Sequence, residues 1–281
     1  MLTFQIQKIT HMKKIISGIF LILTLSLSAQ KSAVFKNEME PNRIYKTEMV
    51  TVNDMTMDMG PLGGKMNMNQ ELTIALTMTT EANQGDLGFP VTMVYDKMTV
   101  KMKMNGNEIP VPIDDALMKA KMVGMYRSGA FTLDKAASSN LTPELEESLG
   151  SAMKDLQDKV QFPKSALAVG DRFENSYPMD LPVPGGQPIK MFIKNNFKLL
   201  ALEGGIGTFE VIQDLSFDGM SEGINMSATG RGEGVMKFDS KKNYVLSYDV
   251  VLPMTMNMTM EDGTIMKMSM TSNSSVKNII E

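Results

Sequence analysis

The sequence predicts a mainly β fold: a strongly curved, half-barrel-like antiparallel sheet of long strands, with one or two central helices packed on its concave face. The first observation is that 30 of the 281 residues are methionine. From Met254 to Met260 every second residue is methionine, which places these thioethers on one face of a β-strand. The second observation is that the apolar alternation already begins at Tyr244. Such a strand is far longer than usual, and we expect it to coil and bend, with Pro253 as the bending point.

The N-terminal segment, residues 1–29, has the composition of a signal peptide. Lys13 and Lys14 precede an apolar run that ends in the small residues Ser28 and Ala29. Met12 is a candidate start, which would make residues 1–11 a misassigned extension. The apolar run is too short for a transmembrane anchor, so we expect an exported protein, periplasmic or extracellular.

The composition excludes several classes of function. The chain has no cysteine, and its one histidine, His11, lies in the predicted signal peptide. The mature protein therefore has no imidazole or thiol for nucleophilic, acid–base or zinc chemistry. We expect no enzyme activity and no cofactor. The net charge of -4 also gives no basic surface for nucleic acid.

The first half of the predicted domain reads as three long strands, at residues 43–59, 66–78 and 91–104. In the second strand only Gln70 interrupts the apolar face. Asn105-Gly106 follows the third strand and is typical of a type I′ turn, so residues 107–112 are expected to form a short return strand.

The middle of the chain, about 114–160, is predicted as a helical insertion in a single domain spanning residues 30–281. Residues 114–126 have helical spacing, and a second helix over 142–160 starts with a Thr142 cap and Pro143 in its first turn. A short strand is expected at 131–133, between the two helices. The proline-rich residues 181–188 are expected to form a loop.

The second half is predicted as two long hairpins followed by a final strand. The first joins 189–202 to 207–217 through Glu203-Gly204-Gly205, and the second joins 224–238 to 244–260. Glycines at 230, 232 and 234 are expected to relieve a bend in a long strand rather than to bind phosphate.

Residues 162–173 carry a resemblance to a known family. There a proline is followed by the turn Val169-Gly170-Asp171 and by Phe173, and the predicted signal ends in Ser28-Ala29-Gln30. In these features the chain resembles a family of secreted or periplasmic β-rich proteins of Bacteroidota, a domain to which no activity is assigned. The resemblance implies fold and export only. The architecture is also loosely similar to periplasmic lipoprotein carriers, which hold acyl chains in a half-barrel capped by helices.

The methionine face allows three interpretations. The plainest is core packing, because methionine fills irregular apolar space. The second is a lining for a hydrophobic ligand, since flexible thioethers repack around varied shapes. The third is a site for Cu(I), which thioethers select.

We predict an exported, non-enzymatic protein that binds or carries a hydrophobic, lipid-like molecule, with an oligomeric state that the sequence leaves open. The alternatives are a Met-only Cu(I)-binding envelope protein and a structural or interaction protein of the envelope. No metal ligands are assigned. The candidate apolar lining consists of Met66, Met68, Met98, Met102, Met104, Met254, Met256, Met258, Met266, Met268 and Met270.

Overall fold

The computed structural model describes residues 32–60, 63–113, 115–140, 160–181, 189–221, 224–260 and 262–281. The chain divides into two compact units, Met1–Ser32 and Ala33–Glu281, and the second unit holds the fold described below. The predicted signal peptide lies outside the described residues. So do nearly all of the predicted helix over 142–160 and of the proline-rich loop.

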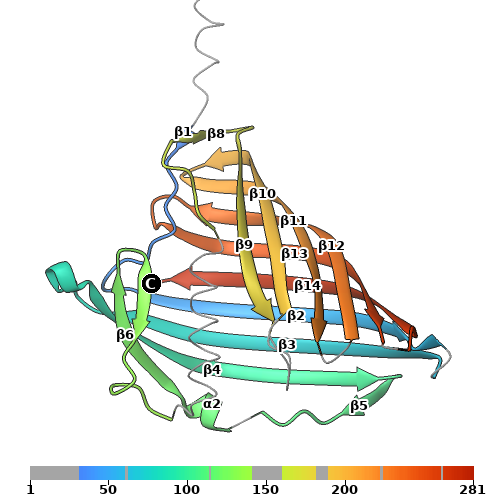
Figure 1. Ribbon diagram of the computed structural model, residues 1–281. Helices are drawn as coiled ribbons and strands as arrows, with labels where there is room; N and C mark the ends of the chain where they lie inside the picture. The colour runs from blue at the N-terminus through green and yellow to red at the C-terminus, as the bar shows by residue number, and fades with distance from the viewer. Residues whose placement is uncertain are drawn as a thin grey trace, which may run out of the picture. The chain divides into compact units, whose positions relative to one another are not determined.

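Twelve strands of the described chain form one antiparallel sheet (Figure 1). Their bounds are β2 (Ile44–Asp58), β3 (Lys65–Thr80), β4 (Phe89–Met104), β5 (Asn107–Ile109), β6 (Lys121–Arg127), β7 (Ala130–Leu133), β9 (Arg172–Leu181), β10 (Ile189–Glu203), β11 (Ile206–Ser221), β12 (Ile224–Asp239), β13 (Tyr244–Thr259) and β14 (Ile265–Ile280). They lie in the order β7-β6-β4-β3-β2-β14-β13-β12-β11-β10-β9, with β5 paired to β4. The minor elements are β1 (Ser32–Ala33), β8 (Leu167–Ala168), the short 3-10 helix η2 (Gly85–Leu87) and α2 (Asp115–Lys119).

The sheet is curved and open. In Figure 1, β2, β3 and β4 run across the view while β9, β10 and β11 descend steeply, so the strand direction turns across the sheet. The two edge strands β7 and β9 pair with their inner neighbours and not with each other. The predicted mainly β, antiparallel architecture of long strands is therefore confirmed.

A local irregularity lies between β12 and β13. Strand pairing passes from Gly230↔Met254 to Glu233↔Val251 with the register unchanged, and Pro253 has no N–H to donate to the ladder. A Cβ atom on Gly230 would lie 2.9 Å from the carbonyl oxygen of Pro253. Glycine is therefore required here because the neighbouring backbone approaches closely, whereas the sequence predicts the relief of a bend.

The predicted hairpins are confirmed. Asn105 and Gly106 have φ values of 49° and 82°, and positive φ at both positions is what a type I′ turn requires. β10 and β11 pair up to Glu203↔Ile206, which leaves Gly204 and Gly205 as the turn.

The first part of the helical insertion predicted over 114–160 is wrong: the helix predicted for 114–126 is mostly replaced by a strand. α2 stops at Lys119, and the chain then forms β6 and β7. Met122, Gly124 and Tyr126 are buried with a period of two, which a strand satisfies and a helix does not. A Cβ on Gly124 would lie 2.3 Å from the Thr132 carbonyl oxygen. Glycine is therefore needed at this position for β6 and β7 to pair so closely.

Helical cover of the sheet is not confirmed, since α2 is the one α-helix among the described residues. No helix in the described part of the chain has the length and apolar character needed to cross a membrane.

The buried side chains gather on one face of the sheet, here called the inner face. Around Tyr45 and Met93 they form one cluster, and around Phe197 and Phe209 they form another. A third cluster contains Met191, Ile193, Leu215, Phe217 and Ala228.

The segment that carries the family resemblance has a packing role. Phe162 and Phe173 join the cluster around Phe197, with Phe173 stacked on Phe197 at a centroid distance of 4.7 Å. Gly170 has a φ of 100°, and its N–H donates to the Leu199 carbonyl. The Val-Gly-Asp turn thereby fixes the start of β9 against β10.

Candidate functional site

The cross-strand register turns the alternating methionines into rows that cross the sheet. These methionine rows lie at the end of the strands where the β2–β3 and β13–β14 hairpins turn. The first row consists of Met254, Met270, Met55, Met68 and Met104, the second of Met256, Met268, Met57 and Met66, and the third of Met226, Met258 and Met266. Strands far apart in the sequence thus build one continuous thioether surface.

Most of the predicted lining residues come together in these rows. Met98 and Met102 lie outside them, because their partners across the ladder are Ile74 and Gln70. Met55, Met57 and Met226 belong to the rows but were not predicted. Met55 and Met57 alternate with polar residues in the same way as Met254 and Met256, so the signal was present in the sequence.

Burial separates these methionines from those of the core. All eleven predicted lining methionines are half-buried. In contrast, Met236, Met122 and Met93 are only 0%, 1% and 2% exposed. Met254 and Met256 pack against the cluster around Ile193, yet both keep part of their surface accessible. The rows are therefore an apolar surface that is partly open.

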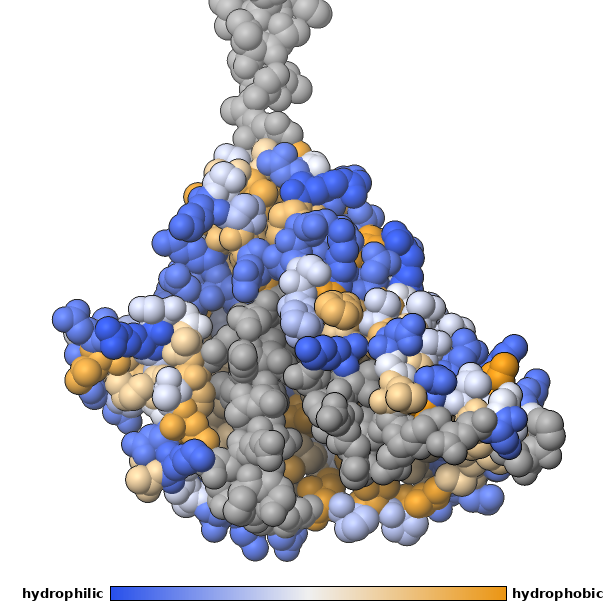
Figure 2. Space-filling view, in the orientation of Figure 1, coloured by the Kyte–Doolittle hydropathy of each residue, from blue (hydrophilic) through white to orange (hydrophobic). Residues whose placement is uncertain are grey.

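The inner face carries no formal charge in the described residues of β2, β3 and β10–β14. Every Asp, Glu, Lys and Arg of these strands alternates with an inward residue and stands on the outer face. There they form cross-strand ion pairs, such as Arg231 with Asp214 at 3.0 Å. Figure 2 shows hydrophilic side chains over much of the described upper surface, with apolar surface along the lower margin.

A polar row crosses the inner face beside the first methionine row. It consists of Asn175, Asn195, Gln213, Ser272, Asn53 and Gln70, with Gly232 and Leu252 between its two halves. Asn53 Nδ2 donates to Gln70 Oε1 at 3.1 Å. Asn175 bonds the backbone of Gln161 through both its oxygen and its nitrogen.

Asn195 differs from the rest of the polar row. It is 2% exposed, and its Oδ1 is buried without a hydrogen-bond partner in the described structure. Leaving a buried acceptor unpaired costs roughly 1–3 kcal/mol. No feature of the sequence marks this residue, because its isolation depends on the packing around it.

Five described tyrosines have a raised pKa, and the increase is largest for Tyr244 and Tyr248. Burial raises the pKa of the Tyr248 hydroxyl well above its ordinary value, and the nearby Tyr177 raises it further. Burial likewise raises the pKa of Tyr244, with a smaller contribution from Tyr45. Both hydroxyls therefore stay neutral at physiological pH and add no charge to the inner face.

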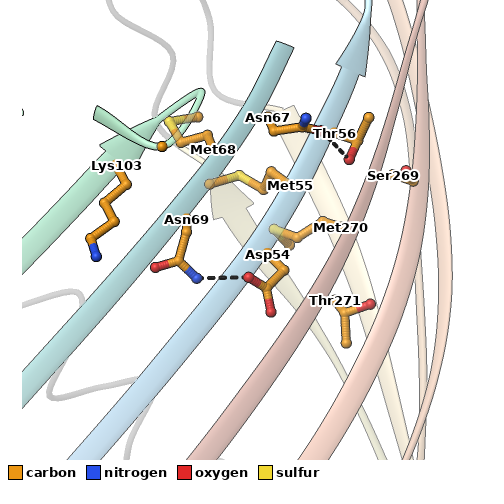
Figure 3. A pocket seen from close by; sticks show the side chains of 11 residues that line it. Asp54, Met55, Thr56, Asn67, Met68, Asn69, Lys103, Ser269, Met270 and Thr271 are labelled. Atoms are coloured by element: carbon orange, nitrogen blue, oxygen red, sulfur yellow. Dashed lines mark hydrogen bonds between the residues drawn. The ribbon is translucent and has the colours of Figure 1, made fainter. Parts of the chain in front are cut away.

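A depression of about 420 Å³ includes three methionines of the first row but is lined mainly by polar residues at outward positions of the strands (Figure 3). It is lined by Asp54, Met55, Thr56, Asn67, Met68, Asn69, Lys103, Gly106, Ser269, Met270 and Thr271. Its polar groups bond one another across β2 and β3, with Asn69 Nδ2 donating to Asp54 at 2.6 Å and Thr56 donating to Asn67 at 2.9 Å. These bonds stabilise strand pairing and identify no reacting group.

The described residues offer no conventional set of metal ligands. The described residues contain no group of three or more His, Cys, Asp or Glu side chains that could hold a metal ion. Thioether binding of Cu(I) is a separate hypothesis, and it stays a prediction.

Comparison with known proteins gives no family. No family model matches the chain, and no curated protein matches it. The resemblance to secreted Bacteroidota proteins therefore stays a prediction.

Two solved structures are similar to parts or all of the chain. A lipovitellin structure, described in terms of lipid–protein interactions, has a TM-score of 0.49 at 8% identity and covers 87% of this chain and 26% of its own. This chain thus spans about a quarter of the lipovitellin chain. The translocator domain of the autotransporter NalP from Neisseria meningitidis has a TM-score of 0.21 at 7% identity, with 96% and 97% coverage. At these TM-scores neither likeness says what the protein binds.

Proposed function

We propose that the protein is an exported, non-enzymatic binding or carrier protein for a hydrophobic, lipid-like molecule, which lies against the methionine rows. The observation that carries this proposal is their partial exposure. A continuous thioether surface crosses six strands and stays half-buried, while other methionines of the same sheet are fully buried.

The chemistry of the rows suits such a ligand. Methionine is unbranched and flexible, so neighbouring side chains can repack around alkyl chains of different shape. The inner face around the rows is uncharged. An apolar molecule can therefore displace water there without the cost of dehydrating a charged side chain. These properties support binding through shape and apolar contact, with no catalytic step.

Native mass spectrometry tests the proposal on the full chain, purified without detergent from cells that express it. The wild-type protein should carry added masses that match lipids. Met268→Lys places a charge in the middle of the second row and should remove them. The matched control is Ser269→Lys, which places the same charge on the outer face one residue away and should retain them.

The fluorescent apolar compound N-phenyl-1-naphthylamine gives a second readout. The wild type and Ser269→Lys should bind it, and Met268→Lys should bind it at least about tenfold more weakly, since this is the loss expected for one unfavourable buried charge. Repeated absence of both lipid masses and fluorophore binding in the folded wild type would contradict the proposal.

A further inference from the structure

The side-chain oxygen of Asn195 is a buried acceptor that a bound molecule could supply with a hydrogen bond. Its Oδ1 is buried without a partner, although the great majority of buried polar atoms in native proteins are paired. On the same strand its inward neighbours are Ile193 and Phe197, which belong to two different buried clusters. The unpaired acceptor therefore lies at the seam between two apolar regions.

The rest of the polar row shows which of its members are already satisfied. Asn175 is held by the backbone of Gln161, and Asn53 and Gln70 bond each other. Gln213 stands opposite Asn195 in the ladder and is half-buried. The polar surface next to the unpaired acceptor is thus an amide pair on β10 and β11.

This amide pair is adjacent to the first methionine row. The row's continuation on β10 and β11 is Ile193 and Leu215, one inward position from Asn195 and Gln213, or about 7 Å along each strand. Met254 and Met256 pack against the cluster that contains Ile193. Because their side chains are flexible, they can shift and open a path from the rows to the amide pair.

Building on the proposed function, we propose that the ligand is an uncharged amphiphile with a single alkyl chain and a hydroxyl head. The chain lies on the methionine rows, and the head donates a hydrogen bond to Asn195 Oδ1 beside Gln213. An uncharged head is required because the inner face of β2, β3 and β10–β14 has no described counter-charge, and burying an unpaired ion is strongly unfavourable.

Displacement of bound N-phenyl-1-naphthylamine from the full chain tests this assignment with three amphiphiles of comparable chain length. These are monolaurin with an uncharged head, laurate with a negative head and dodecyltrimethylammonium with a positive head. We expect monolaurin to bind at least about tenfold more tightly than either ion. Equal binding of all three would overturn the assignment, while binding of the fluorophore itself would leave the proposed function standing.

Substitution at Asn195 tests the hydrogen bond. Asn195→Leu should weaken monolaurin binding by about tenfold and leave fluorophore binding unchanged, since the fluorophore is expected to lie on the methionine rows and not beside Asn195. Asn195→Ala, which makes no steric demand, should give the same loss. The matched control Asn196→Leu changes the next, outward residue and should bind monolaurin as the wild type does. Unchanged monolaurin affinity in both Asn195 variants would contradict the proposal.

Discussion

The two ends of the inner face use the same residue in different ways. At one end Met78, Met93 and Met122 face each other across β3, β4 and β6 within a buried cluster that includes Tyr45. At the other end the methionine rows repeat the same cross-strand pairing but stay half-buried. The difference lies in what covers the side chains, because strand geometry and side-chain chemistry are the same.

This contrast shows that the composition of a face does not decide between core and binding surface. The buried end is closed by aromatic rings, such as Phe89, which is tilted against Tyr126 at a centroid distance of 5.2 Å. Aromatic contact with the rows is described at their β12–β13 edge, where Met226, Met254 and Met256 pack against the cluster that contains Phe217. Truncating a methionine should therefore lower the free energy of unfolding more at the buried end than in the rows.

The largest expected effect is truncation of a buried methionine. Met122→Ala removes a fully buried side chain from the cluster that includes Tyr45 and should lower the free energy of unfolding by about 2–5 kcal/mol. Met268→Ala, in the rows, should cost clearly less because its side chain is already partly exposed. Urea unfolding followed by circular dichroism measures both, and equal losses would remove the distinction between the two ends.

The next effect is a gain in stability at Asn195. Asn195→Leu replaces the unpaired buried acceptor with an apolar group and should raise the free energy of unfolding by roughly 1–3 kcal/mol. Asn196→Leu, the outward control, should change it by less than about 0.5 kcal/mol. A clear loss of stability in Asn195→Leu would mean that the side chain is satisfied in the folded protein.

A smaller effect is expected for a volume-conserving change in the rows. Met256→Leu keeps the apolar character and should cost less than about 1.5 kcal/mol, with fluorophore binding retained. The same substitution also addresses the Cu(I) alternative, because leucine cannot ligate the metal. Loss of Cu(I), measured by competition with a Cu(I) chelator, in Met254→Leu/Met256→Leu/Met258→Leu but not in the wild type would favour that alternative.

The smallest effect at neutral pH is expected at Tyr248. Its pKa is raised in the folded state, so the hydroxyl ionises more readily when the chain is unfolded. Stability should then be independent of pH below the unfolded pKa of about 10 and fall as the pH rises above it. Tyr248→Phe should weaken this fall, which thermal unfolding at a series of alkaline pH values detects. An identical fall in the variant would assign it to other groups.

The sequence predicts local features of this fold well. Alternation along 244–260 and the Asn105-Gly106 turn depend only on neighbouring residues, and both are confirmed by β13 and the β4–β5 hairpin. The sequence predicts a helix over 114–126 from the spacing of Ala116, Leu117, Ala120 and Met125, but residues 121–127 form β6 because apolar residues fit both periods over so short a segment.

The rows and the polar row could not be predicted, because both depend on long-range register. β14 pairs with β2, so Met270 meets Met55 only once the last and the first long strands are aligned. Gln70 interrupts an apolar pattern in the sequence. Its role as a hydrogen-bond acceptor for Asn53 is evident only once the register of β2 and β3 is known. The isolation of Asn195 depends on three-dimensional packing and has no local signal.

Oxidative footprinting by peroxide, read by mass spectrometry of each methionine, tests most directly whether the rows are an accessible ligand surface. In the free protein Met254, Met256, Met268 and Met270 should form sulfoxides, while Met93 and Met236 should not. Bound N-phenyl-1-naphthylamine should protect the rows and leave the other methionines unchanged. Rows that stay inert in the free protein, or that oxidise equally with the fluorophore bound, would contradict a ligand surface there.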